Sequence, residues 1–236
     1  MGYVPYMNIN YLIFMLPTVI ITMLAQWYVS SAYRKWSRIP SRTGLSGKDA
    51  AERLIRTGGL QNVRVEGIQG RLTDHYDPRS KILRLSSGVY QSSSVAAVAI
   101  AAHELGHAMQ DKEGYFPLRI RSMLVPAVNI SSNLGWILIL AGLFLKMINL
   151  AWLGVFAFSA GLVFALVTLP VELNASARAK DLLVRSGIIT NEEEKKGVNR
   201  VLNAAALTYV AAVFAAAMQL LYWISVVGGM SGRRRD

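Results

Sequence analysis

Four long stretches without a charged side chain constrain the fold of this chain more than any other feature. They cover residues 2–33, 122–145, 147–171 and 201–232. Each is long enough to hold the ~20 apolar residues that a helix needs to cross a bilayer. We therefore expect a mainly α-helical integral membrane protein with about four transmembrane helices. These helices are expected near residues 9–29, 126–145, 150–169 and 206–227.

The basic residues are distributed asymmetrically between the expected spans. Of the 25 Lys and Arg residues, all lie in residues 30–125 and 172–200 except Lys146 and the terminal Arg233, Arg234 and Arg235. Basic loops face the cytoplasm in most membrane proteins, so both polar regions are expected there. The net charge of +11 then reflects membrane topology, and no nucleic-acid partner is expected. The sequence predicts a multi-pass protein of the cell membrane.

The polar regions carry the patterns of a small cytoplasmic α+β body, built from about residues 30–125 and 172–203. Ser46 and Asp49 have the spacing of a capping box and predict a short amphipathic helix. The alternating segments "NVRVEG" and "KILRLS" predict two β-strands, a hairpin or small sheet, joined by the loop "GRLTDHYDPRS". One helix is expected over residues 92–110. Another is expected after Pro170, where the third transmembrane helix should end.

The segment "HELGH" carries the chemistry of the chain. On a helix, His103 and His107 lie one turn apart on the same face, so both imidazoles can bind one metal ion. Glu104 is turned about 100 degrees from His103 and stands beside the metal as a general base. Imidazole ligands with one open position for water are typical of catalytic zinc. The chain has no cysteine, so a thiolate site is excluded, and one zinc ion per chain is expected.

A catalytic zinc site needs a third protein ligand, and no histidine follows His107. Glu172 is the favoured ligand because it opens a helix just after the third span and is the only acid between Glu113 and Asp181. Zinc sites with two histidines and one glutamate have this helical context. The alternatives are His75, Asp111, Glu113 and the charge run Glu192, Glu193 and Glu194.

These residues together predict a zinc-dependent endopeptidase of the gluzincin-like HExxH type. It would hydrolyse peptide bonds of peptides or proteins, membrane proteins among them, through a metal-activated water at the cytoplasmic face. The whole of residues 1–236 would form a single membrane metallopeptidase unit. One alternative is a scaffold in which zinc only joins the helices. Cleavage inside the bilayer is another, which Asp111, Lys112 and Glu113 directly after the motif argue against.

The motifs "HELGHAMQ", "VELNASARA", "LTDHYDPRSKILRLS" and "LNAAALTYVAA" resemble those of the YugP-type membrane zinc metallopeptidases over nearly the whole chain. The chain is more distantly similar to the HtpX-type membrane proteases, in which a glutamate on a later helix completes the metal site. The resemblance therefore implies a zincin-like body with Glu172 as the third ligand. The HtpX-type proteases often carry an aspartate four residues after that glutamate, where this chain has Ser176.

The resemblance also suggests roles around the metal. It implies that "KILRLS" is the edge strand beside the site, where a peptide could add by backbone hydrogen bonds; the alternative is an ordinary core strand. His75, Tyr76 and Tyr209 are candidates to stabilise the transition state, or else make local hydrogen bonds. Ser176 would orient a ligand histidine. Arg178 would pair with a site carboxylate or with lipid headgroups.

Overall fold

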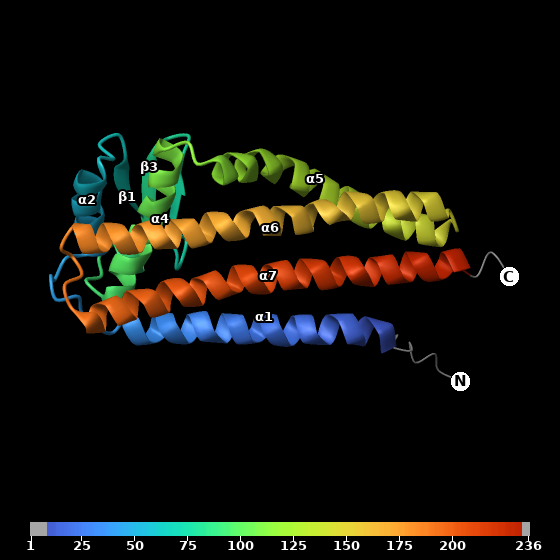
Figure 1. Ribbon diagram of the computed structural model, residues 1–236, viewed down its shortest axis with the longest axis horizontal. Coiled ribbons are helices and arrows are strands. Elements are labelled where there is room, and N and C mark those ends of the chain that lie inside the picture. The colour runs from blue at the N-terminus through green and yellow to red at the C-terminus, as the bar shows by residue number, and fades with distance from the viewer. Residues whose placement is uncertain (1–8, 233–236) are drawn as a thin grey trace. The chain divides into compact units, whose positions relative to one another are not determined.

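The computed structural model describes residues 9–232 and is mainly helical (Figure 1). Four of its helices are long and apolar enough to cross a membrane. They are α1 (Ile9–Trp36), α5 (Phe116–Phe144), α6 (Ile148–Arg185) and α7 (Glu192–Gly232). The expected fold class of four membrane helices with a small sheet is confirmed at this level. The terminal Arg233, Arg234 and Arg235 of the charge argument lie outside the described residues.

The described chain divides into two compact units, and each of the long helices contributes to both. One unit contains residues 9–25, 120–169 and 209–232, and the other contains residues 26–119 and 170–208. In the first unit, α5 and α6 pack through small residues. A Cβ atom on Gly142 would lie 2.4 Å from the backbone nitrogen of Ala151. The two helices are therefore antiparallel neighbours in close contact, as the short connection between them predicts.

The second unit holds a three-stranded sheet and three shorter helices. The strands are β1 (Arg64–Ile68), β2 (His75–Asp77) and β3 (Ile82–Ser86). The shorter helices are α2 (Gly47–Gly58), α3 (Ser87–Tyr90) and α4 (Val95–Lys112). Their apolar side chains form one core with the parts of α6 and α7 that belong to this unit, including the fully buried Leu54, Leu83, Leu105 and Leu182.

The strand order corrects two expectations about the sheet. The order is β1-β3-β2, with β1 parallel and β2 antiparallel to β3. The strand in "KILRLS" is therefore the central strand and not the edge strand, which agrees with the burial of Leu83 and Leu85. The edge position beside it belongs to β2, which lies in the segment expected to be a loop. His75 accordingly sits on a strand.

The ends of α2 and α4 follow from local hydrogen bonds. The Ser46 hydroxyl accepts a bond from the Asp49 backbone N–H at 3.1 Å, and the Asp49 carboxylate accepts one from the Ser46 N–H, so the predicted capping box is present. Ser94 caps α4 in the same way, accepting from the Ala97 N–H at 3.2 Å. Such caps satisfy donors that the first turn leaves without partners.

The α6 helix does not end at Pro170, contrary to the expectation from the sequence. It continues without interruption from Ile148 to Arg185. Proline removes one backbone donor, yet membrane helices tolerate it because other groups can satisfy the freed carbonyl. Glu172 therefore lies inside a continuous helix and not in its first turn.

Candidate metal centre

Close contact between α4 and α6 positions the candidate site (Figure 1). The α4 helix and the part of α6 from residue 170 onward belong to the second unit. Gly106 faces α6 so closely that a Cβ atom there would lie 2.3 Å from the carbonyl oxygen of Ala175. Val171, Ala175 and Ala179 are fully buried at intervals of four residues and share one face of α6, and Ala175 on this face meets Gly106. The adjacent α6 positions, 172 and 176, are thereby brought to the histidine face of α4.

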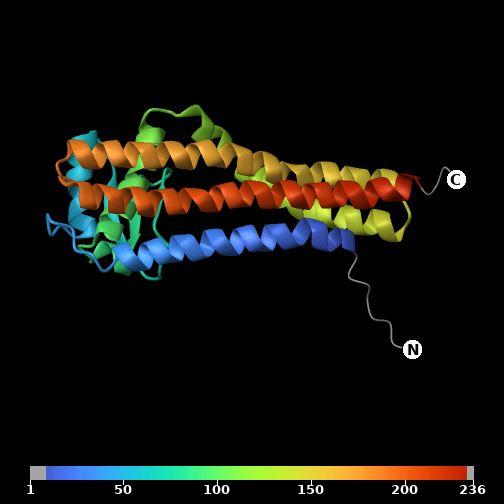
Figure 2. The ribbon, with the colours of Figure 1, turned by 60° about the horizontal axis from the view of Figure 1, so that its bottom comes forward.

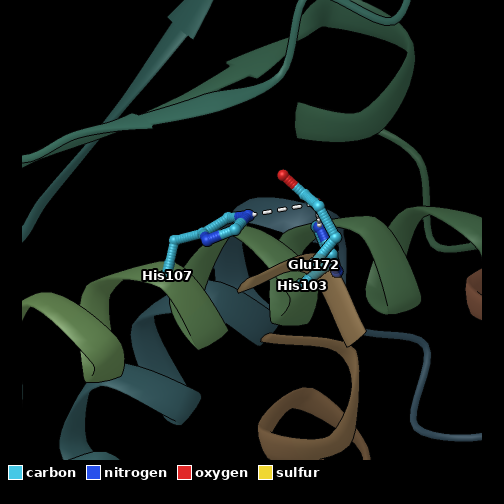
Figure 3. A group of neighbouring side chains, drawn as sticks. All are labelled: His103, His107 and Glu172. Atoms are coloured by element: carbon cyan, nitrogen blue, oxygen red, sulfur yellow. Dashed lines mark hydrogen bonds and ion pairs between the residues drawn. The ribbon is translucent and has the colours of Figure 1, made fainter. Parts of the chain in front are cut away.

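His103, His107 and Glu172 converge at this contact (Figure 3). The Nε2 atom of His103 lies 3.2 Å from Oε2 of Glu172, and the Nε2 atom of His107 lies 3.5 Å from the same oxygen. Their potential ligand atoms all lie within 4.8 Å of one another. Ligand atoms of a tetrahedral zinc ion are separated by about 3.3 Å when the bonds are about 2.0–2.1 Å long. The three side chains therefore fit a zinc ion.

The other ring nitrogen of each histidine is held by a second side chain. The Ser176 hydroxyl lies 3.2 Å from Nδ1 of His103. The Gln110 side-chain oxygen lies 3.0 Å from Nδ1 of His107. The Gln110 amide nitrogen donates to the Val171 carbonyl, so its oxygen is the acceptor and the proton of His107 is on Nδ1. The Nε2 lone pair of His107 is then available to a metal ion.

Gln110 and Asn174 are site residues that the sequence reasoning missed. Gln110 is fully buried and donates to the side-chain oxygen of Asn174 at 2.9 Å. Asn174 also accepts a bond from Nε of Arg178 at 2.7 Å, and Arg178 pairs with Glu113 at 2.7 Å. Arg178 thus pairs with Glu113 and supports the histidine through two amides. The only signal in the sequence is a glutamine three residues after His107, on the same face of the helix.

Glu104 lies next to the cluster and is held by the edge strand. Its Oε2 atom accepts a hydrogen bond from the backbone N–H of Tyr76 in β2 at 3.1 Å. Burial raises the pKa of Glu104, and this effect outweighs the two histidines that lower it. The Tyr76 hydroxyl donates to Asp111 at 2.7 Å. Burial, followed by this hydrogen bond, raises the pKa of Tyr76.

In the described part of the chain, the group that could hold a metal ion includes none of the remaining candidates. His75 is exposed, and its Nδ1 atom lies 2.8 Å from the carbonyl oxygen of Thr73. Asp111 forms an ion pair with Lys81. Glu194 is buried and accepts a bond from the Arg42 N–H at 2.8 Å, so it supports the fold. Tyr209 belongs to the other compact unit.

Comparison with known proteins assigns the class of this chain. It belongs to the family described as "Putative neutral zinc metallopeptidase", whose model matches residues 11–228. The chain is also 45% identical over 202 residues to "Putative membrane protease YugP" of Bacillus subtilis (strain 168). That match covers 86% of this chain and 89% of the relative. No solved structure matches. The predicted YugP-type resemblance is confirmed, and the chain is a multi-pass membrane protein of a zinc metallopeptidase family.

Proposed function

We propose that this protein is a zinc-dependent endopeptidase in which His103, His107 and Glu172 hold one zinc ion per chain. The observation that carries the proposal is the convergence of two Nε2 atoms on one Glu172 oxygen, with the Glu104 carboxylate beside them. A site that only joined the helices would have no use for that additional carboxylate. The family description supports zinc as the metal and peptides or proteins as substrates.

The side chains of this site divide the work of peptide hydrolysis. Bound zinc supplies Lewis-acid chemistry, since it lowers the pKa of water and polarises a carbonyl group. Glu104 accepts a proton from the attacking water and passes it to the leaving amine. The Tyr76 N–H fixes the Glu104 carboxylate for this transfer. Ser176 and Gln110 hold the imidazole rings so that both Nε2 atoms face the same point.

The location of the reaction is part of the same proposal. The distribution of Lys and Arg favours the cytoplasmic face for α4 and for the zincin-like body around it. Of the described helices, α4 is not among those apolar enough to cross a membrane, which argues against cleavage within the bilayer. Residues 1–236 act as a single membrane metallopeptidase, and its substrates are peptides or proteins, membrane proteins among them.

The substitution Glu104→Gln tests this function. It should leave zinc content unchanged and reduce cleavage of a denatured-protein or peptide substrate at least about 100-fold, since a general base contributes 10²–10⁴-fold. Zinc content by mass spectrometry and cleavage of a fluorescent casein would be measured on the full-length purified chain. Glu52→Gln, on the exposed face of α2, is the matched control. Undiminished cleavage by pure Glu104→Gln protein would exclude the mechanism, and zinc-loaded wild type without activity would favour the scaffold.

A further inference from the structure

A cleft of about 630 Å³ lies between the parts of α1 and α7 that belong to the second unit. Figures 1 and 2 both show these two segments side by side. The α1 side supplies Trp27, Tyr28, Lys35 and Trp36, and the α7 side supplies Lys196 and Arg200. The volume is in the range of small-ligand sites. His103, His107 and Glu172 do not line this cleft, and peptide hydrolysis does not account for it.

The cleft is basic, and its cations have no acidic partner. Lys35, Lys196 and Arg200 line it without any carboxylate. Within residues 9–229, none of the three forms an ion pair. Lys35 lies 5.4 Å from the centre of the Trp36 ring, and the Arg200 guanidinium lies 5.0 Å from that of Tyr28. By contrast, the neighbouring Lys195 pairs with Glu192 at 3.2 Å. The cleft therefore offers charged donors to an anion.

The floor of the cleft is tightly packed. A Cβ atom on Gly197 would lie 2.5 Å from the Trp36 ring, so glycine allows α7 to contact α1 directly. Trp36 is buried, and its indole N–H has no hydrogen-bond acceptor in the described part of the chain. Lys196 and Arg200 are one helical turn apart and therefore share a face. Lys196 and Arg200 therefore flank the point at which α7 packs tightly against α1.

The cleft lies where the charged parts of both helices meet their uncharged parts. In α1 the uncharged stretch ends before Arg34, and in α7 it begins after Arg200. Trp27 is 65% exposed at the rim. Tryptophan and tyrosine concentrate at the headgroup level of membranes, and basic side chains beside them attract anionic lipids. The position of the cleft therefore matches the depth of a lipid phosphate.

We propose that this cleft binds a phosphate group, that of an anionic phospholipid headgroup or of a small soluble phosphate. A phosphate presents several acceptor oxygens at once, and arginine with two lysines can bond them simultaneously. The headgroup is the ligand that the membrane-level position favours. The cleft shares no residue with the candidate metal site, so its test needs no catalytic activity.

Native mass spectrometry of the full-length protein in mild detergent would test this site. Phosphatidylglycerol, phosphatidylcholine with the same acyl chains, and inorganic phosphate would be titrated separately. Wild type should retain phosphatidylglycerol in preference to phosphatidylcholine. The double variant Lys196→Gln, Arg200→Gln should bind it at least about tenfold more weakly, as the loss of a charge-assisted hydrogen bond predicts. Arg200→Lys should weaken binding less, because it keeps the charge.

The matched control is the double variant Arg185→Gln, Lys195→Gln, which removes two positive charges that already have acidic partners. It should bind like wild type. Binding of inorganic phosphate that depends on Lys196 and Arg200 would identify a soluble phosphate as the ligand and also support the site. The proposal would be overturned if wild type and the double variant Lys196→Gln, Arg200→Gln bound both lipids equally and neither bound inorganic phosphate. Equal weakening in the control would overturn it as well.

Discussion

At the scale of single residues, Glu172 decides the class of the proposed metal site. It is buried, and its Oε2 atom is the point on which both histidines converge. Neither Asp111 nor Glu113 takes this position, since each is paired with a basic side chain. With Glu172 as the proposed third ligand, 65 residues after His107, this site would differ from HExxH sites that are completed within one short motif.

The substitution Glu172→Ala should abolish stoichiometric zinc binding, because two imidazoles alone leave the ion without its anionic ligand. Zinc would be measured by mass spectrometry on purified protein, with one ion expected per wild-type chain. Glu192→Ala, at an exposed side chain among the alternative ligands, is the matched control and should keep its zinc. A Glu172→Ala protein that retained zinc at the wild-type level would show that another side chain is the third ligand.

In the proposed site, Gln110 would act on the metal through the orientation of His107. Its oxygen accepts the Nδ1 proton, and its nitrogen is anchored to the Val171 carbonyl. Gln110→Met keeps the volume and removes all three side-chain hydrogen bonds, so zinc affinity should fall about 10–100-fold. Competition with a chelator would measure the affinity. Gln61→Met, at an exposed position, is the control, and equal zinc affinities in the two variants would refute the role.

At the scale of elements, the separation of α4 and α6 sets the geometry of the site. Gly106 is the residue that permits their close contact, because any larger side chain would meet the backbone of Ala175. Backbone atoms cannot move aside as the end of a long side chain can. The glycine between the two histidines therefore permits the approach of α6 that brings Glu172 to them.

Gly106→Ala should push α4 and α6 apart and destabilise the protein by about 1–3 kcal/mol, the cost of overpacking a core. The midpoint of thermal unfolding and the zinc affinity should both decrease. Gly88→Ala is the matched control, since the nearest atom to its Cβ would be the Tyr33 hydroxyl at 3.8 Å. A Gly106→Ala protein with unchanged stability and zinc affinity would contradict the proposed contact.

The elements differ in how well the sequence predicts them, for physical reasons. The helix start at Ser46 depends on bonds between near neighbours, and the HExxH spacing is a property of one helix. The order of strands depends instead on contacts between distant segments. The edge position that the resemblance implies for β3 is therefore wrong, and β3 lies at the centre. The strand β2 has three residues, too few for a recognisable alternation.

The site shows the same division between local and distant signals. His103 and His107 follow from spacing alone, and Glu172 is favoured because it is the only acid between Glu113 and Asp181. The pairing of Gln110 with Asn174 could not be predicted, since it exists only once α4 and α6 are packed together. Pro170 predicts a helix end because proline usually stops helices in water, whereas the α6 helix continues through it.

At the scale of the whole molecule, the absence of cysteine from the sequence allows a direct test of orientation. Single cysteines would be introduced as Glu52→Cys on α2 and Lys146→Cys between α5 and α6. With both polar regions in the cytoplasm, a membrane-impermeant maleimide should label Lys146→Cys in intact cells. Glu52→Cys should be labelled only after the cells are opened.

Each position serves as the control for the other, and both variants should be labelled equally in detergent. Labelling of Glu52→Cys in intact cells, with protection of Lys146→Cys, would invert the topology. That result would also place His103, His107 and Glu172 on the opposite side of the membrane, while leaving their geometry unchanged.

The placement of Glu172 on α6 has a consequence for biosynthesis. A ribosome completes the histidine motif of α4 first, and it must then make all of α5 and the apolar part of α6 before Glu172 emerges. A nascent or truncated chain that ends before residue 172 therefore carries the "HELGH" motif without its anionic ligand. Under the proposed ligand set, proteolytic activity begins only after the α5–α6 hairpin has been synthesised, so an incomplete chain that has only α1 as a membrane span does not cleave the proteins around it.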